Sequence, residues 1–193
     1  MTNLVAGPDG RLRCGWATGA AEYLSYHDEE WGRPLRGDDA LFERLSLEAF
    51  QSGLSWITVL RKRPAFRSAF SGFAIEAVAA FDDADVARLM ADPGIVRNRQ
   101  KIDAVIRNAR LAADLPGGLS DHLWSFAPPP SERPPADGAV AATTPESTAL
   151  AADLRARGFR FVGPTTAYAL MQAVGMVNDH IDGCVARAAV IRP

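Results

Sequence analysis

The pattern of apolar and polar positions along this chain is almost entirely helical. Apolar residues recur at three- and four-residue spacing, and the alternation with a period of two that is typical of strands is nearly absent. A first clear helix begins near Asp38 or Asp39, either of which can cap it, and it carries apolar side chains at helical spacing up to Phe50. Gly53 then interrupts the pattern. We therefore expect an all-helical fold.

Proline and aspartate divide the middle of the chain into further helices. Residues 54–63 predict a second helix that ends before Pro64, and this proline opens a short third helix, because proline is tolerated in a first turn. Asp82, followed three residues later by Asp85, is typical of the N-terminal cap of a helix. Residues 95–111 carry one apolar face among basic residues, which predicts another helix.

Two helices with a short connection are predicted in the last third of the chain. Thr144 and Pro145 give a cap and a first-turn proline for a helix that runs to Gly158. Residues 159–163 form a tight connection, and residues 164–175 form the next helix. This order predicts a helix–hairpin–helix motif, although any two helices joined by a short turn share the pattern.

Length and composition place the chain among globular proteins. Its 193 residues, 48% of them hydrophobic and 23% charged, fit a single unit over residues 1–193. We expect two helical lobes with a proline-rich loop at 127–138. No apolar run reaches the roughly 18 to 20 residues of a membrane span, and the start of the chain does not resemble a signal peptide. We therefore expect a cytoplasmic protein. A net charge of −2 does not exclude nucleic acid as a partner, because a local basic face suffices.

The few cysteines and histidines suggest a metal site. His180 and Cys184 are four residues apart, a spacing that places two side chains on one helix face. Besides His122, the remaining candidate ligands are Cys14 and His27 near the other end. Two thiolates and two imidazoles match a closed structural zinc site, which here would join the N-terminal segment to the C-terminal helix. The spacing alone leaves ordinary buried thiols and hydrogen-bonded imidazoles as an equal alternative.

A carboxylate falls on an apolar helix face. Glu48 follows Leu41 and Leu45 on the same face, so its side chain should point into the protein or a cleft. There the carboxylate must be hydrogen-bonded, ion-paired or part of a functional site. An ion pair with one of the nineteen arginines is the alternative to a functional role. Aromatic residues concentrate nearby in sequence, namely Trp16, Tyr23, Tyr26, Trp31 and Trp56. Most such residues belong to the core, but Tyr and Trp beside one carboxylate also describe a pocket for a flat, cationic or hydrogen-bonding ligand.

Several blocks together resemble one enzyme family. They are RCGW (13–16), YHDEEWG (26–32), LFERLSLE (41–48), QSGLSWITVL (51–60), FRFVGPTTAYALMQAVGMVNDH (159–180) and the closing His-x-x-x-Cys. Over about residues 13–184 the chain is similar to the 3-methyladenine DNA glycosylase I family, bacterial alkylation-repair enzymes of the helix–hairpin–helix superfamily. The resemblance implies an enzyme that flips 3-methyladenine out of alkylated double-stranded DNA and hydrolyses its N-glycosidic bond, which releases the free base.

The resemblance also assigns roles to single residues. It places one structural zinc on Cys14, His27, His180 and Cys184. It places the catalytic, base-recognising glutamate on Glu48 and the pocket aromatics on Tyr26 and Trp56, with Trp16 and Tyr23 beside them. Asn178 stands where the wider superfamily has a catalytic aspartate. A base that already carries a positive charge is an activated leaving group, so little acid or base catalysis is then required.

The resemblance implies DNA contacts at two places. The hairpin and the helix after it would offer Gly163, Thr165 and Arg160 to a phosphate. Leu54, beside Gly53, is a candidate wedge for the gap left by the flipped base, and a core leucine is the equal alternative. We expect a monomer.

Two other functions compete with this interpretation. One is a non-enzymatic, zinc-containing helix–hairpin–helix protein that binds damaged DNA. The other is a zinc hydrolase, which four protein ligands disfavour because no coordination position is left for water. A strand-cleaving lyase is also disfavoured, because the only lysines, Lys62 and Lys101, lie far from the hairpin in sequence, so we expect a monofunctional enzyme.

Overall fold

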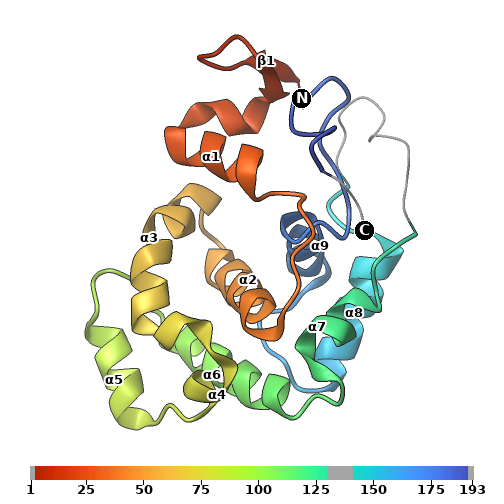
Figure 1. Cartoon of the computed structure of the whole chain (residues 1–193). Helices are drawn as coiled ribbons and strands as arrows, with labels where there is room; N and C mark the ends of the chain where they lie inside the picture. The colour runs from red at the N-terminus through yellow and green to blue at the C-terminus, as the bar shows by residue number, and fades with distance from the viewer. Residues whose placement is uncertain (1–2, 130–140, 191–193) are drawn as a thin grey trace.

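The structure is a computed structural model that describes residues 3–129 and 141–190, and over these residues it is mostly helical (Figure 1). The α-helices are α1 (Ala21–Glu29), α2 (Asp38–Gln51), α3 (Trp56–Ala69), α4 (Ile75–Ala79), α5 (Asp83–Ala91), α6 (Arg99–Ala113), α7 (Gly118–Trp124), α8 (Pro145–Ala156) and α9 (Pro164–Ala173). Short 3-10 helices cover Gly15–Gly19 and Ser71–Phe73. No helix in the described part of the chain is long and apolar enough to cross a membrane. Of the predicted proline-rich loop, residues 130–138 lie outside the described residues.

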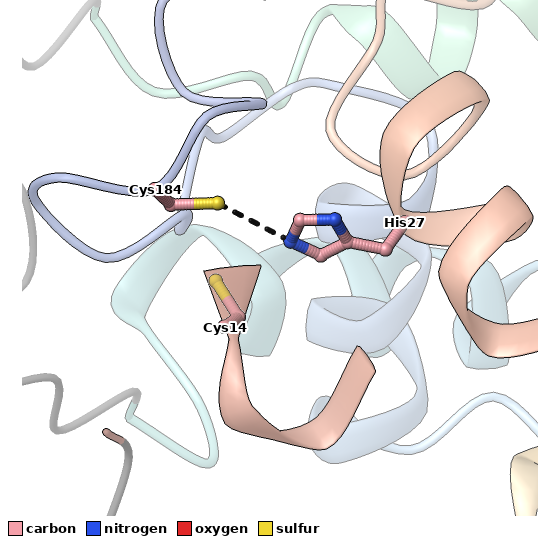
Figure 2. Close-up of side chains that lie close together, drawn as sticks. All are labelled: Cys14, His27 and Cys184. Carbon is pink, nitrogen blue, oxygen red and sulfur yellow. Dashed lines mark hydrogen bonds between the residues drawn. The ribbon is translucent and has the colours of Figure 1, made fainter. Parts of the chain in front are cut away.

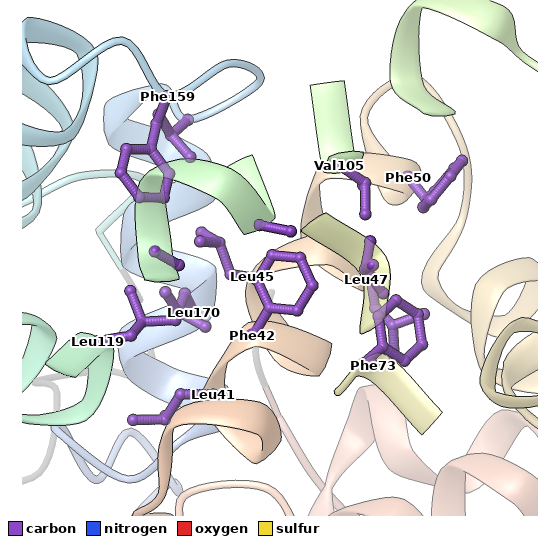
Figure 3. Close-up of a cluster of buried hydrophobic side chains, with 14 of the residues drawn as sticks. Leu41, Phe42, Leu45, Leu47, Phe50, Phe73, Val105, Leu119, Phe159 and Leu170 are labelled. Carbon is purple, nitrogen blue, oxygen red and sulfur yellow. The ribbon is translucent and has the colours of Figure 1, made fainter. Parts of the chain in front are cut away.

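The fold is built around α2. This helix contacts α3 and α6 on one side and α7 and α9 on the other (Figure 1). Its apolar side chains Leu41, Phe42, Leu45, Leu47 and Phe50 are at most 1% exposed. They pack between residues from both sides of the molecule (Figure 3). Burial on several sides makes the second half of α2 almost continuously buried, from Arg44 to Phe50, although the polar residues Arg44, Ser46 and Glu48 fall within this stretch.

The predicted cap of α2 is wrong. The helix is preceded by Gly37 at φ 95°, and neither aspartate caps it. The carboxylates bind other elements instead: Asp38 accepts the amide of Ser120 at 2.8 Å, and Asp39 accepts the amide of Ile75 at 2.9 Å. They therefore tie the starts of α4 and α7 to the first turn of α2.

The predicted break at Pro64 is also wrong. Trp56–Ala69 is a single helix that contains Pro64, and it starts two residues later than predicted, so Leu54 lies in the preceding loop. An internal proline removes one backbone hydrogen bond. Burial of Phe66 and Ala69 beyond it outweighs this loss, since both pack into the main core.

The helix–hairpin–helix motif is present as predicted. Thr144 caps α8 together with Ser147, and Pro145 occupies its first turn. At the other end Gly158 adopts φ 99°, and the amide of Phe159 reaches the carbonyl of Leu154 at 2.9 Å. This is the left-handed helix stop that favours glycine. The predicted cap of α5 at Asp82 is confirmed as well, with Asp85 completing the capping box.

The prediction that His180 and Cys184 share a helix face is wrong, because residues 178–184 are not helical. The chain leaves α9 at Gly175 (φ 74°), where a Cβ atom would lie 2.4 Å from the carbonyl carbon of Arg33. The C-terminal segment then reaches the N-terminal hairpin, where the amide of Val185 donates to the carbonyl of Leu12 at 2.9 Å.

The N-terminal hairpin was not predicted. Strands β1 (Leu4–Ala6) and β2 (Leu12–Cys14) pair antiparallel, with Leu4 opposite Cys14. They are too short to show alternation, and the turn sequence GPDG between them was the available signal. The helices α1, α4 and α7 were also missed.

A buried lysine holds the end of α2. Lys101 of α6 is 6% exposed, and its Nζ donates to the carbonyls of Phe50 (2.9 Å) and Ser52 (2.6 Å). The last carbonyls of a helix have no partner within the helix, and they attract a cation. Burial lowers the pKa of Lys101. The side chain thereby fixes the loop that carries Gly53 and Leu54.

Replacing Lys101 should therefore destabilise the protein. We expect Lys101→Met to lower the free energy of unfolding by about 2 to 3 kcal/mol, because the buried carbonyl of Phe50 and the partly buried carbonyl of Ser52 lose a charged donor. Lys62→Met is the matched control, since Lys62 also binds two carbonyls, at Pro93 and Gly94, but it is only half-buried. Urea unfolding of both variants checks this, and equal losses would contradict it.

Candidate active site

A cavity of 310 Å³ opens between α9 and the elements that carry the N-terminal aromatics. This is near the lower end of small-molecule pockets, which span roughly 300 to 1,000 Å³. Its aromatic walls are Trp16, Tyr26, Trp31 and Trp56. Its polar side chains are Glu48, Gln51, Gln172 and Asp179, and Cys14, Ala169 and Ile181 complete it. A flat ligand with a few polar edge atoms suits this lining.

Glu48 lies deep in the cavity without a protein partner. Its side chain is 5% exposed, and no described residue donates a hydrogen bond to it. Burial raises the pKa of the carboxyl to about 8, and the charge of Arg44 opposes this shift only in part. The sequence alternative of an arginine pair is not realised, because Arg44 and Arg63 both bind Glu30. A ligand in the cavity could therefore supply the hydrogen-bond partner that the carboxyl group of Glu48 lacks.

Three of the four predicted pocket aromatics line the cavity. Trp56 is the first residue of α3, and its ring centre lies 5.3 Å from that of Tyr26. The indole Nε1 of Trp56 is buried and has no partner among the described residues. Trp16 is 36% exposed, at the edge of the cavity. Tyr23 does not line it: its hydroxyl accepts the amide of Ile57 at 3.0 Å, which fixes the start of α3.

The lining includes residues that the sequence reasoning did not assign to the pocket. Trp31 was one of the aromatic residues noted near Glu48 in sequence, but the resemblance gave it no role in the pocket. Gln172 and Asp179 lie within the family-like block, so membership of that block was the available signal. Gln51 comes from the last turn of α2. The lining thus combines α1, α2, α3, α9 and the C-terminal segment.

Three of the four predicted metal ligands meet in space. The ligand atoms of Cys14, His27 and Cys184 lie within 4.8 Å of one another, and all three residues are buried (Figure 2). His27 Nε2 lies 3.4 Å from Cys184 Sγ. Contact with the Cys14 thiol, and then with His27, lowers the pKa of Cys184 and favours its thiolate. These groups have the chemistry that a soft divalent metal requires.

His180 lies beside this group but outside that distance. Its ring centre is 4.8 Å from that of His27, and its Nε2 is buried with no partner among the described residues. Burial, and then the charge of His27, lower the pKa of His180 to about 4, so the ring is neutral. Its Nδ1 is held by Asn178 Oδ1 at 2.8 Å, as His27 Nδ1 is held by Asp28 at 2.8 Å. Fixing one ring nitrogen leaves the other for a metal, so the residues fit such a site.

Arg13 anchors this arrangement to the N-terminal hairpin. It is 3% exposed and donates to both Asp28 (2.8 Å) and Asp9 (2.6 Å). Asp28 in turn holds His27. The hairpin, α1 and the metal-ligand group are therefore linked by charged hydrogen bonds, which are stronger than neutral ones.

The loop that carries two of the predicted DNA-contact residues, Gly53 and Leu54, borders the cavity. Leu54 is 40% exposed, which contradicts the alternative of a core leucine. It follows Gly53 (φ 79°) in the loop between Gln51 and Trp56, two residues that line the cavity. This loop therefore borders the cavity and presents an apolar tip to solvent.

The hairpin residues are also accessible. Gly163 is the cap of α9, and Thr165 is exposed in its first turn. Asn108 of α6 clamps the backbone of exposed Arg160, since its amide oxygen accepts at 2.9 Å and its amide nitrogen donates at 3.1 Å. The same helix α9 contributes Ala169 and Gln172 to the cavity. Helix α9 thus carries hairpin residues at its start and cavity residues further along.

Comparison with known proteins gives a consistent result. The model of the methyladenine glycosylase family matches residues 16–188. DNA-3-methyladenine glycosylase 1 of Escherichia coli (strain K12) is 44% identical over 89% of this chain and 95% of its own length. DNA-3-methyladenine glycosylase of Haemophilus influenzae is 41% identical over 89% of this chain and 96% of its own length.

Solved structures agree in fold. A crystal structure of 3-methyladenine DNA glycosylase I superimposes with a TM-score of 0.85 at 44% identity, over 90% of this chain and 98% of that one. A structure of 3-methyladenine DNA glycosylase I from Staphylococcus aureus, which concerns 3-methyladenine recognition, also superimposes with a TM-score of 0.85. Its sequence is 34% identical, and the match covers 91% of this chain and 96% of that one. A family match over most of the chain, together with these relatives, establishes that this chain belongs to the methyladenine glycosylase family.

Proposed function

We propose that this protein excises 3-methyladenine from alkylated double-stranded DNA by hydrolysis and releases the free base. The observation that carries the proposal is the unpartnered carboxyl of Glu48 at the bottom of an aromatic cavity. Relatives with the name of this activity cover most of the chain. We also propose that the protein is a monomer and acts in the cytoplasm.

The cavity suits a methylated adenine because of the base's shape and charge. Trp56 and Tyr26 would stack on the flat ring, and stacking on an aromatic side chain contributes about 1 to 3 kcal/mol per base. Methylation at N3 gives the nucleoside base a positive charge. Glu48 would accept hydrogen bonds from the adenine edge, and its carboxylate form would be stabilised by that charge. An unmodified adenine brings no charge into the same site.

DNA would be held by the elements that border the cavity. The first turn of α9, with Gly163 and Thr165, would offer backbone amides to a phosphate, and Arg160 would add charge. Leu54 would fill the gap left in the duplex. Base flipping requires such support because the extruded base loses its stacking and pairing.

The enzyme should be monofunctional. A lyase needs an amine that attacks the sugar, and Lys101 Nζ is instead bound to the carbonyls of Phe50 and Ser52. Lys62 Nζ is bound to the carbonyls of Pro93 and Gly94. Neither lysine lines the cavity. Water is therefore the expected nucleophile.

Cys14, His27, His180 and Cys184 would hold one structural zinc. His180 would become the fourth ligand through its buried Nε2. A zinc with four protein ligands adds stability and has no open position for water. Bound here, it would fasten the C-terminal segment to the hairpin and α1, and its binding free energy would add to the stability of the fold.

Excision of the free base tests the function. On methylated DNA the protein should release 3-methyladenine, detected by chromatography, and Glu48→Gln should lower the rate by on the order of 100-fold while DNA binding is retained. Glu43→Gln is the matched control, because this glutamate of α2 pairs with Arg67 instead of facing the cavity. DNA binding without any release by the wild type would favour the non-enzymatic binder.

The raised pKa of Glu48 predicts a dependence of stability on pH. The folded protein holds this proton up to about pH 8, while the unfolded chain releases it near pH 4.5, so the folded state binds more protons between these values. Wild-type stability should fall as pH rises through that window, and Glu48→Gln should not show this loss. From pH 5 to pH 8.5 the variant should gain a few kcal/mol relative to wild type, measured by urea unfolding. If the difference in stability between Glu48→Gln and wild type stayed the same over this pH range, the raised pKa of Glu48 would be contradicted.

Zinc removal should affect stability and not chemistry. Elemental analysis should find about one zinc per chain, and Cys184→Ser should lose it and melt on the order of 10 °C lower. Below its melting temperature this variant should excise 3-methyladenine at nearly the wild-type rate. His122→Gln is the control, because this histidine binds Asp153 away from the group. The proposal of a structural zinc would be wrong if the wild type were stable without metal, or if the Cys184→Ser variant folded but were inactive.

A further inference from the structure

The cavity contains a second carboxylate with a different environment. Asp179, in the segment after α9, has one oxygen fixed: Oδ2 accepts Tyr168 Oη at 2.6 Å and Gln172 Nε2 at 2.8 Å. No described residue donates to its Oδ1. Because Asp179 lines the cavity and Oδ2 is occupied, Oδ1 is the oxygen available there. A carboxylate held in this way is rigid and has one free acceptor.

The two donors come from a single face of α9. Tyr168 and Gln172 are four residues apart and therefore lie on the same side of that helix. Burial, followed by the contact with Asp179, raises the pKa of Tyr168, so its hydroxyl remains a donor. The position of Asp179 is thus set by the helix whose first turn is proposed to bind DNA.

The neighbouring side chains point to different sites. Asn178 binds His180 Nδ1 at 2.8 Å and the carbonyl of Arg187 at 3.3 Å, and it does not line the cavity. Asp179 lines it. At this turn the chain sends an amide toward the metal-ligand group and a carboxylate toward the cavity.

Burial indicates which part of a nucleotide each carboxylate would meet. Glu48 is almost completely buried, whereas Asp179 is only half-buried and so lies nearer the mouth. A flipped nucleotide stays attached to the duplex through its sugar and phosphates, so its base enters first and its deoxyribose remains at the mouth. Glu48 would then meet the base, and Asp179 would lie beside the sugar.

We propose that Asp179 is a second catalytic residue, which holds through Oδ1 the water that attacks C1′ of the deoxyribose. This inference rests on the proposed function. The C1′–N9 bond breaks and its electron pair passes to the methylated base, which becomes neutral. The water oxygen bonds to C1′, and a water proton passes to Asp179 and then to solvent. Until that bond forms, the carboxylate stabilises the positive charge that develops on the sugar.

Asp179→Asn separates this role from packing. The amide oxygen can still accept from Tyr168 and Gln172, while the negative charge and the acceptor facing the cavity are lost. We expect single-turnover excision of 3-methyladenine from methylated DNA to fall on the order of 100-fold. The dissociation constant for free 3-methyladenine and the melting temperature should stay at wild-type values.

Tyr168→Phe provides a second variant in case Asp179→Asn folds poorly. It keeps the carboxylate and removes one of its two donors, so the excision rate should fall less, again without weakening of free-base binding. Excision within threefold of wild type by a folded Asp179→Asn would overturn the inference, as would a loss of free-base binding in proportion to the rate. If the wild type itself releases no 3-methyladenine, the proposed function fails instead.

Discussion

Burial of α2 is the constraint on which the rest of the structure depends. Helices pack on both of its sides, and its apolar side chains form the centre of the core. A carboxyl group on such a helix is costly unless something compensates for its desolvation. Glu48 receives only part of this compensation, from the charge of Arg44, and the stability of the surrounding core maintains the buried carboxyl. The cavity exists because α3 and α9 pack against α2 without covering that carboxyl, and Tyr26 of α1 completes the wall.

The two ends of the chain form the other half of the cavity. The C-terminal segment returns to the N-terminal hairpin, and this brings Cys184 to Cys14 and His27 (Figure 2). Cys14 and Ile181 also line the cavity, so the wall of the candidate active site is the wall of the metal-ligand group. The segment that closes the fold is therefore the same segment that carries Asp179, whose side chain α9 holds in place.

Local signals in the sequence predicted local structure well. The caps at Asp82 and Thr144 and the stop at Gly158 depend on neighbouring residues, and they were found. Pro64 was misread because the burial of residues beyond it, which no local pattern reports, keeps α3 continuous. Asp179 was missed as a cavity residue for a similar reason, since only the packing of α9 shows where its side chain points. Helical spacing placed Glu48 on the buried face of α2 but left an arginine pair open, and the family resemblance, which carries tertiary information, assigned it to a pocket.

Under the proposed function, charge must decide which base is excised. Stacking on Trp56 and Tyr26 cannot discriminate, since every purine has a flat face. The shape of the cavity also discriminates weakly, because a single methyl group changes the binding free energy by only about 1 to 3 kcal/mol. A cation differs in kind: it favours the carboxylate of Glu48, against the burial that otherwise keeps the group protonated, and it weakens the bond to the sugar. An uncharged adenine does neither, so it would meet a protonated carboxyl group and keep a strong glycosidic bond.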